Sequence, residues 1–304
     1  MQFSTKIPVA SPPRPISLHN RVAFIGSCFA ERIGEQMKLG GLPTLVNPFG
    51  VLYNPLSILQ ALTQNPMFNP LYFQDSEGVW HCWLTDSSFN SSTIDACRAR
   101  VLAARGRLFE WNPDVVVITL GTNRYYQTQS FVVGNCHKQP ASLFTEQSLG
   151  GDQAVTILTT ICQLFPKAQV IFTVSPYRYA KYGFHESQLA KSVLLLAIDA
   201  VQKARPEQVL YFPAYELLLD ELRDYRFYAE DMLHPSPQAI QYIWERFVQT
   251  FMDDESHRYF VDFEPIRRAL QHRPINPGSE EAEQFLNQTH RKLAELQLKY
   301  AIGD

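Results

Sequence analysis

The chain has 304 residues, of which 45% are hydrophobic and 19% charged, and this composition is typical of a globular protein with enough chain to bury a sizeable core. The formal net charge is −3 and no basic stripe with interleaved aromatic residues occurs, so we expect no nucleic-acid partner. The first residues lack the apolar segment of a signal peptide and no run of about 18 apolar residues exists, so we expect no membrane association and a cytoplasmic location.

The five cysteines are odd in number and none forms a C-x-x-C pair. They stand at positions 28, 82, 97, 136 and 162. This pattern is typical of reduced thiols in a cytoplasm rather than of a disulfide framework or a zinc site. Cys136 and His137 are adjacent potential ligands without partners at zinc spacing, so we predict no metal site and no cofactor.

Predicted strands and helices alternate along most of the chain. The strands are predicted at residues 22–26, 43–46, 114–120, 169–174 and 208–212. The helices are predicted at about 29–39, from near 55, and at 91–110, 152–165, 186–204 and 237–251. The third strand is apolar throughout, as expected of a strand covered on both faces. The alternation predicts a three-layer α/β/α fold whose five-stranded parallel sheet has the flavodoxin-like order 2-1-3-4-5.

Other segments lie outside this alternation. Residues 2–20 are proline-rich and are predicted to form an extended arm on the domain. Residues 70–90 look irregular and aromatic, and the long excursion over residues 124–150 is interpreted as a cap over the site. We divide the chain into a main domain, residues 1–255, and a C-terminal extension, residues 256–304, composed of a proline-rich link and a helix over 280–300.

Polar groups gather where three of the predicted strands end. Ser27 and Cys28 follow the first strand, Gly121 and Asn123 follow the third, and the stretch from Asp231 to His234 follows the fifth. Ligands of parallel α/β sheets bind outside the carboxyl ends of the strands. A helix beginning near Ser27 would favour an anion at its positive end and lower the pKa of the Cys28 thiol.

The spacing D-x-x-H places Asp231 and His234 on one side of a turn. The carboxylate then accepts from one imidazole nitrogen and leaves the other facing a nucleophile, as a catalytic triad requires. The Asn123 amide and a backbone N–H of Gly50 or Gly121 would hold an oxyanion. In the alternative interpretation the Asp–His pair caps the last helix of the domain and Asn123 is only a turn former.

The chain order of these blocks resembles that of the SGNH hydrolases, in which G-D-S opens the domain, G-x-N-D follows the third strand and D-x-x-H closes it. The closer resemblance is to the GSCFA family, whose characteristic sequence motifs occur here at residues 26–30, 47–50, 52–55, 119–122, 135–138, 174–178 and 222–228. They read G-S-C-F-A, N-P-F-G, L-Y-N-P, T-L-G-T, N-C-H-K, V-S-P-x-R and L-R-D-Y-R-F-Y. The resemblance covers residues 2 to about 252 and implies an SGNH-type hydrolase with no particular substrate. A tyrosine, Tyr179, stands where that family commonly has a histidine.

The nucleophile is predicted from the alignment of G-S-C with G-D-S. Cys28 takes the place of the serine, and a thiol at a helix N-terminus near a histidine is activated in two ways. Ser27 is the alternative nucleophile and is also a natural helix N-cap. In a third interpretation neither residue reacts and Cys28 is a small buried hydrophobic residue.

Four residues are candidates for substrate binding: Asn47, His137, Lys138 and Arg178. His137 and Lys138 either contact substrate or hold the cap. Arg178 either clamps a carboxylate or phosphate or pairs with an internal acid, for which Glu186, Glu216 and Asp224 are the candidates.

These observations predict acyl-ester hydrolysis through an acyl-enzyme, on a small molecule or glycan. Cys28 attacks, His234 acts as base and then acid, Asp231 orients His234, and the amides of Cys28, Gly50 and Asn123 stabilise the oxyanion. The suggested substrate, an O-acylated carbohydrate, comes from analogy with SGNH hydrolases alone. With a sugar hydroxyl as acceptor the same site is an acyltransferase, and a catalytically silent glycan-binding module is the non-enzymatic alternative. The sequence does not indicate an oligomeric state.

Overall fold

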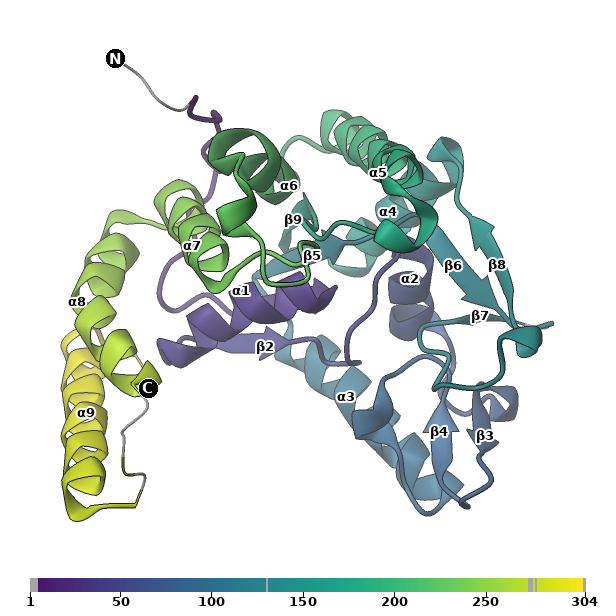
Figure 1. The fold of residues 1–304 in the computed structure, drawn as a ribbon, viewed down its shortest axis with the longest axis horizontal. Coiled ribbons are helices and arrows are strands. Elements are labelled where there is room, and N and C mark those ends of the chain that lie inside the picture. The colour runs from purple at the N-terminus through teal and green to yellow at the C-terminus, as the bar shows by residue number, and fades with distance from the viewer. Residues whose placement is uncertain (1–4, 130, 273–275, 277, 303–304) are drawn as a thin grey trace.

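The computed structural model describes residues 5–129, 131–272, 276 and 278–302 (Figure 1). Its central sheet consists of β1 (Val22–Gly26), β2 (Thr44–Val46), β5 (Val115–Leu120), β9 (Gln169–Val174) and β10 (Val209–Phe212). Neighbouring strands follow the order β10-β9-β5-β1-β2, and every pair is parallel. The predicted fold class and the predicted order 2-1-3-4-5 are therefore confirmed.

Helices cover both faces of this sheet (Figure 1). One face packs against α2 (Pro55–Thr63), α3 (Ile94–Trp111), α4 (Gly151–Leu164) and α5 (Phe184–Ala204). The other face packs against α1 (Cys28–Leu39), α6 (Ala214–Glu216) and α7 (Pro237–Phe251), and α8 (Asp254–Gln271) joins the same apolar cluster by packing against α7. Alternate strand residues serve the two cores: Ala23 faces the first and Phe24 the second, as the two-residue period of a strand requires.

Two small antiparallel sheets lie beside the main one. Residues 70–90, predicted as irregular, contain the hairpin of β3 (Tyr72–Gln74) and β4 (Trp80–Cys82). The excursion over 124–150 contains β6 (Arg124–Gln127), β7 (Val132–Val133) and β8 (Thr145–Ser148), in the order β7-β6-β8. The alternation of polar and apolar residues in these strands is too short to be recognised as a strand pattern.

The two chain ends cover the second core. From residue 5 to residue 20 the N-terminal arm contains no helix or strand; it bends at residues 13–14 and turns at 18–20, Ile16 is buried and paired to Met252, and residues 1–4 lie outside the described part. The predicted link after residue 255 is wrong over α8, where Tyr259 and Phe263 are buried on one helical face although Pro265 lies inside the helix. The remainder of that link, residues 273–275 and 277, is outside the described residues.

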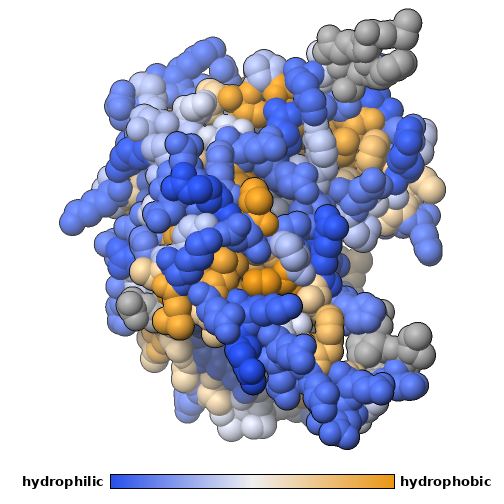
Figure 2. Space-filling view, turned by 90° about the vertical axis from the view of Figure 1, so that its left-hand side faces the viewer, coloured by the Kyte–Doolittle hydropathy of each residue, from blue (hydrophilic) through white to orange (hydrophobic). Residues whose placement is uncertain are grey.

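The predicted C-terminal helix is present as α9 (Glu280–Lys299) and packs alongside α8 (Figure 1). Lys299 Nζ and the Tyr300 hydroxyl both donate to Asp262 Oδ2, at 2.7 and 2.9 Å. The Tyr259 hydroxyl donates to the carbonyl of Gly40, which fixes α8 to the end of α1. Figure 2 shows that this side of the molecule is mostly hydrophilic, with apolar patches between polar side chains. Among the described residues, no helix has the length and apolarity needed to cross a membrane.

Gly26 makes the turn from β1 into α1 possible. Its φ of +138° lies in a region that L-residues rarely adopt, and a Cβ there would lie 2.1 Å from the Thr119 carbonyl oxygen. The Ser27 N–H donates to that same oxygen at 3.2 Å, and the Gly26 N–H donates to Asn47 Oδ1 at 2.9 Å. The start of α1 is thereby fixed beside the ends of β2 and β5.

We predict that Gly26→Ala lowers the free energy of unfolding by more than about 2 kcal/mol, because it adds both backbone strain and a backbone clash. The matched control is Gly151→Ala, at a helical position with nothing within 4 Å of an added Cβ, which should change stability by less than about 1 kcal/mol. Urea denaturation measures both. Equal midpoints for the two variants would contradict this role of Gly26.

Candidate active site

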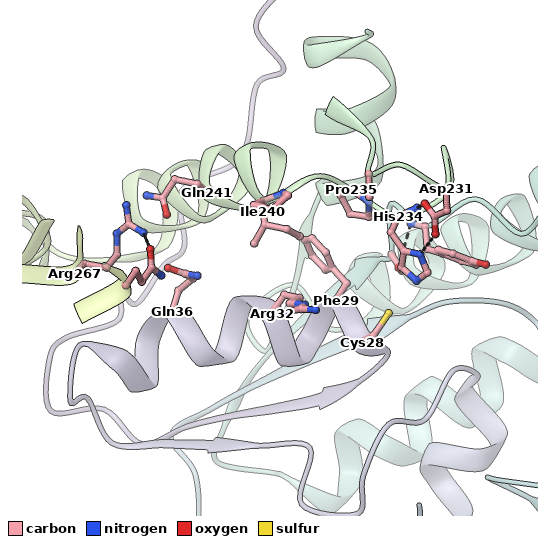
Figure 3. A pocket seen from close by; sticks show the side chains of 15 residues that line it. Cys28, Phe29, Arg32, Gln36, Asp231, His234, Pro235, Ile240, Gln241 and Arg267 are labelled. Atoms are coloured by element: carbon pink, nitrogen blue, oxygen red, sulfur yellow. Dashed lines mark hydrogen bonds and ion pairs between the residues drawn. The ribbon is translucent and has the colours of Figure 1, made fainter. Parts of the chain in front are cut away.

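A cavity of about 760 Å³ lies where β1 and β9 end and extends along α1 (Figure 3). Its lining comes from one side of α1, the residues that follow β9, the loop before α7, and the helices α7 and α8. The residues are Cys28, Phe29, Arg32, Gln36, Ser175, Tyr177, Ala229, Asp231, His234, Pro235, Pro237, Ile240, Gln241, Arg267 and Gln271. Three of the four residues predicted as catalytic therefore share one cavity, although more than 200 residues separate Cys28 from His234.

Ser27 and Cys28 have different environments at the start of α1. Ser27 is 1% exposed, and its Oγ accepts from the Phe29 N–H at 3.3 Å, so it acts as the helix N-cap. Cys28 is the first helical residue, is half-buried and lines the cavity. In Figure 3 its sulfur points toward the loop that carries Asp231 and His234. The geometry favours Cys28 over Ser27 as the group that meets a substrate.

Asp231 and His234 form a close pair at the mouth of the cavity. His234 Nδ1 lies 2.5 Å from Asp231 Oδ2, and Asp231 Oδ1 accepts from the backbone N–H groups of Leu233 and His234, each at 2.9 Å. The hydrogen bond from the His234 ring, followed by those from the backbone, lowers the pKa of Asp231 to about 2. Within the described part of the chain, His234 Nε2 has no hydrogen-bond partner, so this nitrogen is left to act on another group.

The predicted lowering of the Cys28 pKa is wrong. Burial raises the pKa of this thiol, and the nearby Glu31 carboxylate raises it further. Arg32 and the N–H groups of Cys28 and Phe29 oppose the rise without overcoming it. The favourable interaction of a thiolate with a helix N-terminus offsets only a fraction of the free-energy cost of removing that thiolate from water. Cys28 therefore rests as a neutral thiol that needs a base at the moment of attack.

The predicted oxyanion donors are engaged elsewhere. The Gly50 N–H donates to the Asn47 carbonyl at 2.8 Å, and the Gly121 N–H donates to the Tyr53 carbonyl at 2.7 Å. Asn123 Nδ2 donates to the Leu149 carbonyl at 2.8 Å. None of these donors lines the cavity in the described structure, so the structure does not support their predicted role. The first turn of a helix leaves its N–H groups unpaired, which makes the Cys28 N–H the remaining donor of the predicted set.

Asn47, a predicted substrate-binding residue, contributes to the scaffold. Its φ is +40°, its N–H donates to the Phe24 carbonyl at 2.8 Å, and its Oδ1 holds the Gly26 N–H. Among the described residues its buried Nδ2 has no hydrogen-bond partner. Asn47 thus fixes the β1–α1 turn and acts on Cys28 indirectly.

His137 and Lys138 do not line the cavity that holds Cys28. His137 Nε2 lies 2.8 Å from the Cys82 carbonyl, and its ring packs against His81 at 4.9 Å between centroids. Burial lowers the pKa of His137. No described residue from 124–150 lines the cavity, so the structure does not place the predicted cap over it. In the described ranges no group of three or more His, Cys, Asp or Glu side chains is arranged to hold a metal ion.

Arg178 holds the loop of the Asp–His pair. Its Nη1 donates to the Met232 carbonyl and its N–H to the Leu233 carbonyl, each at 3.1 Å. Its guanidinium lies 4.2 Å from the centroid of the Phe184 ring. The three predicted acidic partners are engaged elsewhere: Glu186 pairs with Arg124 at 2.7 Å, Asp224 with Arg226 at 3.0 Å, and Glu216 accepts from the Tyr211 hydroxyl. Arg178 is therefore a positioning residue for the segment 231–234.

Lys191 is a residue that the sequence analysis missed. It is 1% exposed, and its Nζ donates to the carbonyls of Ser175 and Gly121, at 2.6 and 3.1 Å. These carbonyls follow β9 and β5, so one buried ammonium ties together the ends of two strands next to the site. Burial lowers the pKa of Lys191 to about 7. The sequence feature that could have indicated Lys191 is its position on the apolar face of α5, three residues before the buried Leu194.

Two family models match the chain. One, described as the GSCFA family, covers residues 21–247, and one, described as the C-terminal domain of GSCFA domain proteins, covers residues 263–304. A search of curated proteins gives no match.

Solved structures of low similarity also match. An acetyl xylan esterase from the rumen bacterium Butyrivibrio proteoclasticus is 13% identical with a TM-score of 0.40, over 81% of this chain and 64% of that one. A family 3 carbohydrate esterase from Clostridium thermocellum is 13% identical with a TM-score of 0.36, over 84% of this chain and 100% of that one. Similarity of this degree carries no argument about activity.

We predict that the free energy of unfolding rises with pH between about pH 7 and pH 10 because of Lys191. Its pKa is about 7 when folded and 10.5 ordinarily, so the unfolded chain binds more protons in this window. Relative to Lys191→Met, the wild type should gain up to about 1.4 kcal/mol per pH unit. Urea denaturation at several pH values measures this difference.

The control is Lys203→Met on the same helix, where the exposed lysine pairs with Asp199 at 2.7 Å. The difference in free energy of unfolding between Lys203→Met and the wild type should stay constant over this pH window. If the difference in free energy of unfolding between Lys191→Met and the wild type were also constant with pH, Lys191 would have an ordinary pKa and the prediction would be wrong.

Proposed function

The chain belongs to the GSCFA family, and we propose that it is an ester hydrolase with Cys28 as nucleophile and an O-acylated carbohydrate as substrate. One observation carries the proposal: the Asp231-bound imidazole of His234 and the sulfur of Cys28 face the same cavity. A carboxylate, an imidazole and a thiol in this arrangement are the parts of a nucleophilic triad.

The first half of the proposed reaction forms an acyl-enzyme. His234 Nε2 takes the proton of the Cys28 thiol as its sulfur bonds to the ester carbonyl carbon. The tetrahedral oxyanion then collapses and the bond to the alkoxyl oxygen breaks. His234 gives the proton to that oxygen, and the alcohol leaves.

Water completes the cycle. His234 takes a proton from water as its oxygen attacks the thioester carbon, the carbon–sulfur bond breaks, and the proton returns to the sulfur of Cys28. Asp231 stays ionised above pH 2 or so, since its pKa is about 2, and it holds the imidazole through Nδ1. The Cys28 N–H at the positive end of α1 is the donor we assign to the oxyanion.

Two features of the site support hydrolysis as the reaction and a carbohydrate as the substrate. The side chains of His234 and Asp231 are 48% and 44% exposed, so water reaches them and hydrolysis is favoured over acyl transfer to a sugar hydroxyl. Tyr177 lines the cavity and is partly exposed, and an aromatic face suits the C–H face of a sugar ring.

We predict that Cys28→Ala and His234→Ala each lower kcat/KM on small acyl esters by at least about 10³-fold, because each removes a part of the triad. Asp231→Asn should lower it by about 10²- to 10⁴-fold through the wrong imidazole tautomer. Steady-state hydrolysis of 4-nitrophenyl acetate and of acetylated sugars measures these effects.

The control is Cys136→Ala, which removes a half-buried free thiol that does not line the cavity. It should leave the rate within about twofold of the wild type. Sugar binding without turnover, unchanged by Cys28→Ala, would establish the binding module and overturn the hydrolase.

A further inference from the structure

The cavity extends well beyond the groups that the proposed reaction uses. Cys28, Arg32 and Gln36 line it from successive turns of α1, each four residues after the last. Eight residues of helix span about 12 Å, so the cavity is much longer than an acetyl ester. Figure 3 shows Cys28 and His234 at one end, Gln36, Gln241 and Arg267 at the other, and Phe29 and Ile240 between them.

The far end is lined by three glutamine amides and by Arg267, and Arg32 lines the cavity between this end and Cys28. A glutamine amide both donates and accepts hydrogen bonds, and Gln241 Nε2 already donates to Glu245 Oε1 at 2.9 Å. The Arg267 guanidinium donates to both carboxylate oxygens of Glu264, at 2.7 and 2.8 Å, and to Gln271 Oε1 at 2.8 Å. Glu264 also accepts from Arg268 Nε at 2.8 Å, so one carboxylate serves two guanidinium groups and the position of Arg267 is fixed before any ligand binds.

An unused acceptor points independently to a hydroxylated ligand. In the described structure Gln36 Oε1 is buried and has no hydrogen-bond partner. A buried acceptor left unpaired costs about 1–3 kcal/mol, and a ligand hydroxyl that donated to it would remove this cost. Sugar hydroxyls both donate and accept, which matches the glutamine amides.

The far end depends on the C-terminal segment. Arg267 and Gln271 lie on α8, one turn apart, within the segment matched by the C-terminal family model. α8 is fixed to the rest by the buried Tyr259, whose hydroxyl donates to the Gly40 carbonyl at the end of α1. Both family-matched segments therefore contribute walls to one cavity.

We propose that this far end is a subsite for an oligosaccharide chain. The acylated sugar unit lies at Cys28, the next lies over Phe29 and Ile240, and a further unit hydrogen-bonds to Gln36, Gln241, Gln271 and Arg267. The inference rests on the proposed hydrolase function, since it assigns the chain that carries the ester. It gives α8 a substrate-binding role that small esters do not require.

The test compares Arg267→Ala and Gln271→Ala with Arg268→Ala. Arg268 is the matched control, because it also donates to Glu264 at 2.8 Å but its side chain is 75% exposed and does not line this cavity. The readout is the ratio of kcat/KM on an O-acetylated neutral trisaccharide to kcat/KM on 4-nitrophenyl acetate. This ratio is insensitive to the fraction of folded enzyme.

We expect Arg267→Ala and Gln271→Ala to lower this ratio at least tenfold, mainly by raising KM for the trisaccharide, and Arg268→Ala to leave it unchanged. The wild type should prefer the trisaccharide to the acetylated monosaccharide. An unchanged ratio in both variants, or no preference for the trisaccharide over the monosaccharide, would overturn the subsite. A wild type without activity on any ester refutes the hydrolase instead, and calorimetric titration of the trisaccharide into wild type and Arg267→Ala then decides the subsite alone.

Discussion

The close approach of the Gly26 backbone to the carbonyl of Thr119 is the constraint on which the site depends. It allows α1 to begin immediately after β1, so that Ser27 caps the helix and Cys28 faces outward from its first turn. The direction of α1 then sets the direction of the cavity, because Arg32 and Gln36 follow Cys28 along one helical face. A bulkier residue in this turn would displace the nucleophile and the cavity wall together.

Burial and charge have opposite effects on the proposed nucleophile, and burial prevails. The thiol of Cys28 rests protonated although it lies at the positive end of a helix. Its reactivity therefore depends on His234, and the position of His234 depends on two further interactions. Asp231 holds the ring through Nδ1, and Arg178 holds the intervening Met232 and Leu233 carbonyls. Lys191 joins the ends of β5 and β9 through hydrogen bonds to the Gly121 and Ser175 carbonyls, and its burial lowers its pKa to about 7.

Features that depend on local pattern and topology could be predicted from the sequence. Buried strands are recognisable as apolar runs, and parallel topology brings their carboxyl ends together, which suffices to bring Cys28 and His234 to one cavity. The oxyanion donors could not be predicted, because a turn in the folded chain decides whether the Gly50 and Gly121 N–H groups are already paired. Pro265 disfavours a helix and therefore led to the prediction of a link. α8 nevertheless forms there, because the burial of Tyr259 and Phe263 outweighs the cost of an internal proline.

The central claim is that the Cys28 sulfur carries the acyl group. The most direct measurement is rapid acid quenching of the enzyme during turnover of an acetyl ester, followed by peptide mass analysis and treatment with hydroxylamine. We predict an acetyl group on the peptide that contains Cys28, located on the cysteine, removed by hydroxylamine as a thioester is, and absent in Cys28→Ala. Acetylation of Ser27, or steady turnover without any acylated residue, would contradict it.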